Sequence, residues 1–381
     1  MKTDTGTLSR GPIDSARSDF LKRLLARLHL DLPLLFLLLL LCGVGLLILF
    51  SASEQNQALI NRQLLRLGLA FLAMLVIAQI PPHYLRLVTP WLFVASLGML
   101  LAVLIIGDIG KGAQRWLNLG LFRFQPSELT KLALPMIVAW YLADKPLPLD
   151  AKRIIFSVLL IVVPVLMIAK QPDLGTSILV LSSGVMVLFL AGLSWRYIIA
   201  GGVLAAATAP VVWYFMHNYQ RQRVLTFLNP ESDPLGAGYH IIQSKIAIGS
   251  GGVYGKGWLN GTQSHLEFLP ERSTDFIFAV LGEELGLVGC VGLLVLYLLI
   301  IMRGLYIATQ GQDTFSRLLA GGLMLTFFVY LFINTGMVIG LLPVVGLPLP
   351  LISYGGTSMV TIMAGFGILM SIHTHRKLLA R

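Results

Sequence analysis

The sequence predicts an all-α polytopic membrane protein with about ten transmembrane helices and a large outer loop between helices 7 and 8. Of its 381 residues, 56% are hydrophobic and only 12% are charged, whereas soluble domains carry about 25% charged residues. The mean hydropathy is +0.81. Lys and Arg outnumber Asp and Glu by 28 to 18, an excess that in a membrane protein reports topology. These observations exclude a soluble enzyme, and we expect no nucleic-acid partner.

Ten apolar runs are long enough to form spanning helices, because about 20 residues cross a hydrocarbon core of about 30 Å. The first run is about 19 residues long, more than a signal peptide needs, so we interpret it as a retained anchor helix. The ten expected spans lie near residues 33–51, 64–80, 88–107, 127–143, 153–169, 173–192, 195–216, 276–302, 317–341 and 355–372.

The basic residues orient this bundle. With the N-terminus in the cytoplasm, 16 of the 28 Lys and Arg residues fall on inner segments, as the positive-inside rule requires. We therefore predict cytoplasmic tails at 1–30 and 377–381 and one membrane domain at 31–376. Its long loop, 216–275, faces away from the cytoplasm.

Three stretches have a residue pattern that predicts or excludes a local structure. Residues 239–248 combine apolar and polar positions in a pattern typical of a short amphipathic helix on the membrane surface. The glycine-rich stretch 249–257 lacks the glycine and the hydroxyl residue that a phosphate-binding P-loop needs, so an ATPase is excluded. The prolines and glycines of 343–358 forbid a continuous helix, and such backbone at membrane depth indicates a neighbouring cavity.

Charges at membrane depth usually face a bundle interior or a wet cavity. Glu128 follows Pro126 in the first turn of the fourth span, and Lys131 lies three residues on, on the same face and close enough to pair. An internal salt bridge that merely positions helices explains this pair as well as a functional site does. Asp173 begins the sixth span, where capping the helix and lining a charged cavity are equally good explanations.

Asp275 marks the point where the long loop re-enters the membrane. It follows Ser273 and Thr274 and precedes apolar residues, which is also the pattern of a helix N-cap. In a partly dry site its carboxylate would be a usable proton acceptor. Glu283 and Glu284, about two turns deeper, are adjacent acids in an apolar helix and are hard to explain as a solvated face.

Basic residues gather on the outer side and suit a phosphate-bearing substrate. Attraction to anionic lipid head groups explains them equally well. These residues are Arg115, Arg221, Arg223, Lys245 and Lys256.

Six strings, in order along almost the whole chain, resemble the SEDS family (shape, elongation, division and sporulation) of bacterial membrane proteins. Within the family, the region before Asp275 is more similar to the rod-shape branch than to the division branch. The strings are QPSELTK, QPDLGT, RVLTFLNP, IAIGSGG, LPERSTDFIFAVLGEELG and GLPLPLISYGGTS, the last of which contains Ser353.

The resemblance implies a peptidoglycan glycosyltransferase in the bacterial inner membrane that polymerises lipid II at the periplasmic face during cell elongation. It implies a class B penicillin-binding protein transpeptidase as partner within the elongation machinery, and undecaprenyl-pyrophosphate as leaving group. Asp275 would be the general base. Glu128, Lys131, Asp173, Arg115, Arg223, Lys245 and Ser353 are the candidate substrate-binding and cavity residues. No cofactor is required, although a divalent cation, Mg or Mn, could assist.

Two other functions account for the same features. A lipid II flippase would also need buried charges, broken helices and a cavity, but most charges lie at the outer rim and few at mid-depth. A scaffold for the elongation machinery would use the long loop as a binding surface, and Asp275 would then be dispensable.

Overall fold

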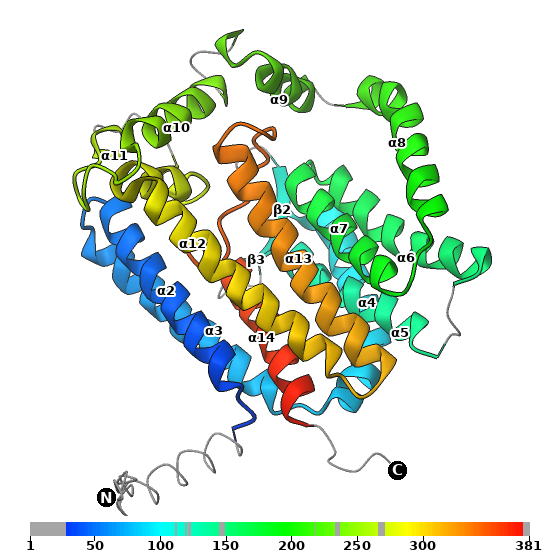
Figure 1. Ribbon diagram of the computed structural model, residues 1–381. Helices are drawn as coiled ribbons and strands as arrows, with labels where there is room; N and C mark the ends of the chain where they lie inside the picture. The colour runs from blue at the N-terminus through cyan, green and yellow to red at the C-terminus, as the bar shows by residue number, and fades with distance from the viewer. Residues whose placement is uncertain are drawn as a thin grey trace, which may run out of the picture.

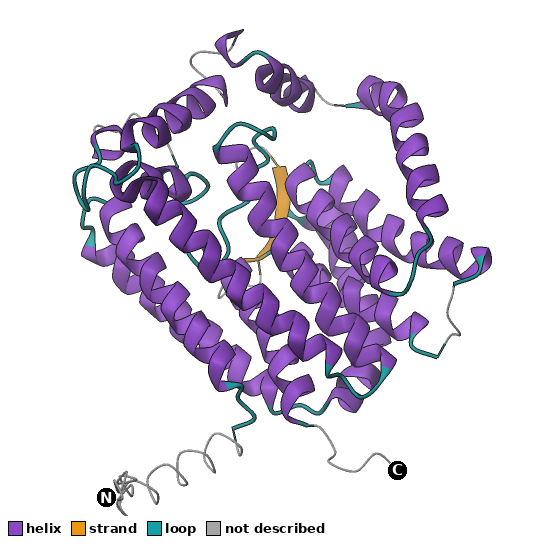
Figure 2. Ribbon diagram, viewed as in Figure 1, coloured by secondary structure: helices purple, strands orange, loops and turns teal. Residues whose placement is uncertain are grey.

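The structure is a computed structural model that describes residues 28–110, 113–118, 120, 123–144, 149–216, 218–232, 237–265 and 271–375. Within these ranges the chain forms a helical bundle with one small sheet (Figures 1 and 2). The predicted tail 377–381, and all but the last residues of the tail 1–30, lie outside the described residues.

Each of the ten expected spans contains a long helix, which confirms the fold class. Seven of these helices are long and apolar enough to cross a membrane, and α7 and the apolar part of α8 are somewhat shorter. The ten helices are α2 (Leu32–Ala52), α3 (Gln57–Ala78), α4 (Pro82–Ile106), α5 (Pro126–Leu142), α6 (Ala151–Lys170), α7 (Leu174–Leu190), α8 (Trp195–Phe215), α12 (Ile277–Thr309), α13 (Thr314–Val338) and α14 (Thr357–Thr374).

Helices α5 and α13 form the centre of the bundle. In α13, 72% of the most apolar 18-residue stretch is buried inside the protein, and most residues of α5 are buried as well. Figure 1 shows α2, α3, α12 and α14 on one side of this centre and α4, α6 and α7 on the other. The outer helices expose large apolar side chains such as Phe36 and Trp91, as expected where the solvent is lipid.

The long loop between α8 and α12 is largely helical. It contains α9 (Asn218–Leu228), the 3-10 turn η1 (Pro230–Ser232), α10 (Ala237–Gly251) and α11 (Thr262–His265), and Figure 1 shows α9 and α10 along one end of the bundle. The predicted helix at 239–248 is confirmed as part of α10. Ile241, Ser244 and Ala247 of this helix are buried in the protein, while Ile246 is exposed, so the packed face combines apolar and polar positions. Packing against α12 and α13 therefore orients α10.

The segment between α4 and α5 departs from the predicted all-α fold. It forms three short antiparallel strands, β1 (Asp108–Gly110), β2 (Ala113–Asn118) and β3 (Arg123–Phe124), in the order β1-β2-β3. The sheet holds Arg115 next to the first residues of α5 and α7, where its guanidinium donates to Pro172 O at 2.6 Å.

The two ends of the described chain meet at one end of the bundle. The rings of His29 and His375 stack at a centroid distance of 4.0 Å, and His373 Nε2 lies 3.1 Å from Asp31 Oδ2. The predicted irregular segment at 343–358 lies at the opposite end of α14, and the chain is non-helical there until Thr357. Because α14 has 18 residues, about 27 Å separates these two ends.

Candidate active site

A polar cavity of about 210 Å³ lies where α5, α7 and α14 begin, beside α13 and the non-helical segment 343–356. Four of the residues predicted to bind substrate, Arg115, Glu128, Lys131 and Asp173, line it. The other lining residues are Trp116, Gln125, Thr176, Tyr330, Gly346, Leu347, Pro348, Gly355, Gly356, Thr357 and Ser358.

Glu128 and Lys131 form the predicted ion pair. Pro126 begins α5, which places both side chains on one face, and Lys131 Nζ lies 2.8 Å from Glu128 Oε1. Both side chains are more than nine-tenths buried. The Lys131 ammonium also lies 5.3 Å from the centroid of the Tyr330 ring. Since Glu128 Oε2 has no hydrogen-bond partner among the described residues, this pair keeps an unused acceptor beside the cavity.

Asp173 both caps a helix and lines the cavity, so neither of the two explanations excludes the other. Its Oδ1 accepts the backbone N–H of Thr176 at 3.2 Å, which caps α7. Its Oδ2 accepts from Gln125 Nε2 at 3.2 Å and lies 3.6 Å from Arg115 Nε. One carboxylate therefore joins the sheet, α5 and α7.

Asp275 lies in a turn immediately before α12 and not at the N-cap. The N-cap is Phe276, and no side chain caps the helix, so the N-cap interpretation of Asp275 is wrong. Asp275 Oδ2 lies 3.5 Å from where a Cβ on Gly346 would stand. Asp275 is not among the described residues that line the cavity, but Gly346 is. The Asp275 carboxylate therefore lies next to a residue of the cavity wall, and the absence of a side chain on Gly346 leaves room between them.

The other predicted residues are outside this cavity. Ser353 is buried, donates to Thr274 O at 2.5 Å and accepts from Leu349 N at 2.7 Å, so it ties segments of the chain together. Arg223 lies on α9 and Lys245 is exposed on α10. Neither is among the described residues that line the cavity.

Arg221 and Lys256, which lie outside the cavity, contact other parts of the fold. Arg221 donates to the carbonyls of Trp213 and Tyr214 at the end of α8. Lys256 Nζ lies 2.7 Å from Glu283 Oε1. The cations that line the cavity are therefore Arg115 and Lys131.

Glu283 holds the long loop onto α12, and Glu284 joins α12 to α2. Glu283 Oε1 accepts from Thr262 Oγ1 at 3.1 Å and from Gln263 N at 2.9 Å, in addition to the contact with Lys256. Glu284 accepts a short hydrogen bond from Ser51 of α2. The adjacent acids that hydropathy did not explain thus have partners that become neighbours only in the fold.

Sequence reasoning missed two polar residues of α13, Tyr330 and Asn334. They lie one turn apart and are both buried, the first against the cavity and the second beneath Asp275. The signal was available, because polar side chains at an i, i+4 spacing stand on one face of an apolar helix.

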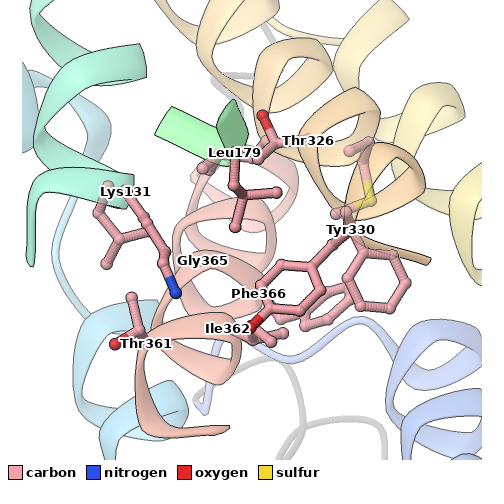
Figure 3. Close-up of a pocket in the computed structure, with 12 residues that line it drawn as sticks. Lys131, Leu179, Thr326, Tyr330, Thr361, Ile362, Gly365 and Phe366 are labelled. Atoms are coloured by element: carbon pink, nitrogen blue, oxygen red, sulfur yellow. The ribbon is translucent and has the colours of Figure 1, made fainter. Parts of the chain in front are cut away.

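Below the polar cavity is an apolar pocket of about 50 Å³ that shares Lys131 and Tyr330 with it. Figure 3 shows Lys131 entering this pocket from one side and Tyr330 from the other. Its remaining lining residues are Leu132, Leu179, Leu323, Met324, Thr326, Phe327, Thr361, Ile362, Gly365 and Phe366. Lys131 therefore stands at the boundary between a polar and an apolar compartment.

The described residues offer no group of three or more His, Cys, Asp or Glu side chains that could hold a metal ion. The cavity carboxylates of Glu128 and Asp173 already face Lys131 and Arg115. A divalent cation held here would therefore take few protein ligands and would rely on substrate phosphates for the rest.

Residues 32–378 match the family model described as cell cycle protein, which covers FtsW, RodA and SpoVE. The chain belongs to this family, the SEDS family. It is 58% identical to the peptidoglycan glycosyltransferase MrdB of Escherichia coli strain K12, over 93% of this chain and 96% of that protein. It is 37% identical to a probable peptidoglycan glycosyltransferase FtsW of Geobacter metallireducens, over 91% and 95% of the two chains.

Solved structures agree with this membership. A chain of the structure described as "Structural coordination of polymerization and crosslinking by a peptidoglycan synthase complex" matches with a TM-score of 0.80 and 37% identity, over 91% of this chain and 98% of that one. The crystal structure of the rod shape determining protein RodA of Thermus thermophilus matches with a TM-score of 0.70 and 30% identity, over 91% and 98%.

Proposed function

We propose that this chain is a peptidoglycan glycosyltransferase that polymerises lipid II at the outer face of the cytoplasmic membrane during cell elongation, with Asp275 as general base. Family membership and the 58% identity to a glycosyltransferase over nearly the full length support the activity. The observation that carries the site is the position of the Asp275 carboxylate beside Gly346, which is part of the wall of a cavity that Arg115 and Lys131 line.

The reaction needs a base at one side of the anomeric carbon and cations at the other. A hydroxyl oxygen of the acceptor sugar attacks the anomeric carbon and forms the glycosidic bond. The Asp275 carboxylate accepts the hydroxyl proton. The bond from the anomeric carbon to the pyrophosphate oxygen breaks, and undecaprenyl-pyrophosphate leaves with the electron pair. Arg115 and Lys131 stabilise the charge that develops on it, while Glu128 holds the Lys131 ammonium in place.

The position of the cavity supports the proposed orientation. It lies at the start of α14, whereas His375, just after the end of α14, stacks on His29. If both termini are cytoplasmic, the cavity then opens on the periplasmic side. A periplasmic reporter fused near residue 240, on α10, is expected to be active, and a cytoplasmic reporter there inactive; the opposite result would reverse the orientation.

A transpeptidase is the proposed partner. The structure most similar in fold among those compared above belongs to a complex whose description names polymerisation and crosslinking together. We infer that a class B penicillin-binding protein binds this chain and crosslinks the glycan that it makes, within the elongation machinery.

The test is glycan polymerisation from labelled lipid II by the full chain, purified in detergent with its transpeptidase partner. Detergent removes membrane sidedness, so a flippase has no reaction to perform. We expect polymer from the wild type and none from Asp275→Asn, with both proteins equally folded by size exclusion and thermal unfolding. The matched control is Asp313→Asn, which removes an exposed carboxylate at the N-cap of α13, where it makes no capping hydrogen bond. Full activity of Asp275→Asn would refute the assigned base.

A further inference from the structure

Three consecutive backbone carbonyls immediately before α12 accept hydrogen bonds from α13 and from the non-helical segment that follows it. Such bonds fix the backbone that carries the Asp275 side chain. The donors and acceptors are Tyr354 N to Ser273 O at 2.8 Å, Ser353 Oγ to Thr274 O at 2.5 Å, and Asn334 Nδ2 to Asp275 O at 3.0 Å.

Asn334 differs from the other two donors because its amide group acts on two segments at once. Its Nδ2 also donates to Leu347 O at 2.7 Å. Leu347 lines the cavity and follows Gly346, the residue that faces the Asp275 carboxylate. A single side chain thus sets the backbone of Asp275 and the opposing cavity wall relative to each other.

Asn334 is a polar side chain in the core, where a residue that served packing alone would cost less free energy if it were apolar. It is fully buried in α13, in the most buried of the candidate spans, where a polar group is tolerated only when it is satisfied. Its two N–H groups have partners, yet its Oδ1 has no hydrogen-bond partner among the described residues. Packing alone would be served as well by Leu, which has the same number of side-chain heavy atoms and brings no polar atom of its own into the core.

We propose that Asn334 is a positioning residue for catalysis, which holds the Asp275 carboxylate at its working distance from the cavity by bridging Asp275 O and Leu347 O. This inference rests on the proposed role of Asp275 as general base. Displacement of a reacting group by about 1 Å costs on the order of 10²-fold in rate. Loss of the bridge is therefore expected to act on kcat, because the cavity residues that bind the substrate remain in place.

The experiment measures kcat and KM for labelled lipid II with the full chain and its transpeptidase partner, normalised to folded protein. Asn334→Leu removes both donors, and we expect kcat per folded molecule to fall about 10²-fold with KM within about twofold of the wild type. Asn334→Asp keeps the shape and offers at most one donor to the two carbonyls, so we expect an intermediate fall of about tenfold. It also keeps the test decisive if Asn334→Leu fails to fold.

The matched control is Ser371→Ala. It removes another buried hydrogen bond from a side chain to a carbonyl, between Ser371 and Ile80 O, at the other end of the bundle. We expect this variant to lose some folded protein while keeping kcat per folded molecule. Asn334 variants that behave in the same way would overturn the positioning role, even though wild-type polymerisation upholds the proposed function. Absence of polymer from the wild type would instead refute the proposed function itself.

Discussion

Replacement of Gly255 by Ala tests how the long outer loop is attached to the bundle. Gly255 has φ +78°, and a Cβ there would lie 2.1 Å from Glu284 O and 2.6 Å from Leu285 N. Both atoms belong to the backbone of α12, at the point where Gly286 breaks the helix with φ 65° and ψ −161°. No side-chain rotation can relieve this clash, so the loop must move away from the helix.

The cost follows from the bonds that this movement breaks. Ordinary contact begins at 3.4 Å, so the loop must shift by about 1.3 Å, which is enough to break hydrogen bonds of 3.0 to 3.1 Å. At about 1 kcal/mol for each bond and 1 to 2 kcal/mol for a left-handed alanine, the free energy of unfolding should fall by about 5 kcal/mol. The bonds join Lys256 N to Glu283 O, Gly257 N to Glu284 O, Leu287 N to Gly252 O and Val288 N to Val253 O.

The measurement is unfolding of the purified full chain in detergent, with Gly252→Ala as the matched control. Gly252 also has a positive φ, +57°, but a Cβ there would meet nothing within 4 Å. The control isolates the backbone strain and should cost only about 1 to 2 kcal/mol. If the two variants lose stability equally, the loop is not docked on the break in α12 and the reasoning fails.

Ion pairs at three depths should respond differently to loss of their acid. Glu128→Gln leaves the Lys131 ammonium buried without its partner and should destabilise the fold by about 3 to 5 kcal/mol; the double variant Glu128→Leu, Lys131→Met should regain stability but not polymerisation, and recovery of both would make the pair merely structural. Burial alone would raise the pKa of Asp31, but hydrogen bonds from Arg303 and a backbone N–H hold this pKa below its ordinary value of 3.8. The stability gap between wild type and Asp31→Asn, followed by thermal unfolding, should therefore be constant above about pH 5 and should close as the pH falls below 3.8; a gap that widens in acid would contradict this. Glu54 is 45% exposed in its ion pair with Arg272. Glu54→Gln should therefore lower the free energy of unfolding by less than about 1 kcal/mol in the same measurement.

The sequence was sufficient for the long helices because lipid imposes a simple rule on them. Each of the ten apolar runs contains a helix, since backbone polar groups in hydrocarbon must be satisfied within the segment. The boundaries were less predictable. The run near 276–302 continues to Thr309 and breaks at Gly286, because partners from the loop, and not the local sequence, satisfy the backbone at that break.

The candidate site was predictable where its contacts are local. Glu128 and Lys131 lie three residues apart, and helical geometry alone brings them together. Asn334 lies 59 residues from Asp275, and no local pattern in the sequence pairs them. Likewise, Lys256 and Glu283 are 27 residues apart, so a surface cation and a buried acid were interpreted separately.

The distribution of buried charge favours a transferase over a flippase. In the described part of the chain, the buried charged side chains apart from Asp31 are Glu128, Lys131, Asp173, Glu283 and Glu284, and all lie toward the end where α5, α7 and α12 begin. Beneath Lys131 the interior narrows to the small apolar pocket of Figure 3. Its wall includes buried aromatic rings such as that of Phe366.

A sugar headgroup that crossed the membrane through this bundle would have to separate packed helices and replace apolar contacts along about 27 Å, the length of α14. No buried charged side chain lies between the cavity and Asp31 among the described residues. The buried hydroxyls of Ser183 and Thr326 already donate to backbone carbonyls of their own helices, so little is available there to replace the lost hydration of the headgroup. The proposed polymerase needs no such path, because its reacting atoms would stay at the end of the bundle that holds the cavity, and only the apolar polyprenyl chain of the proposed substrate would reach deeper.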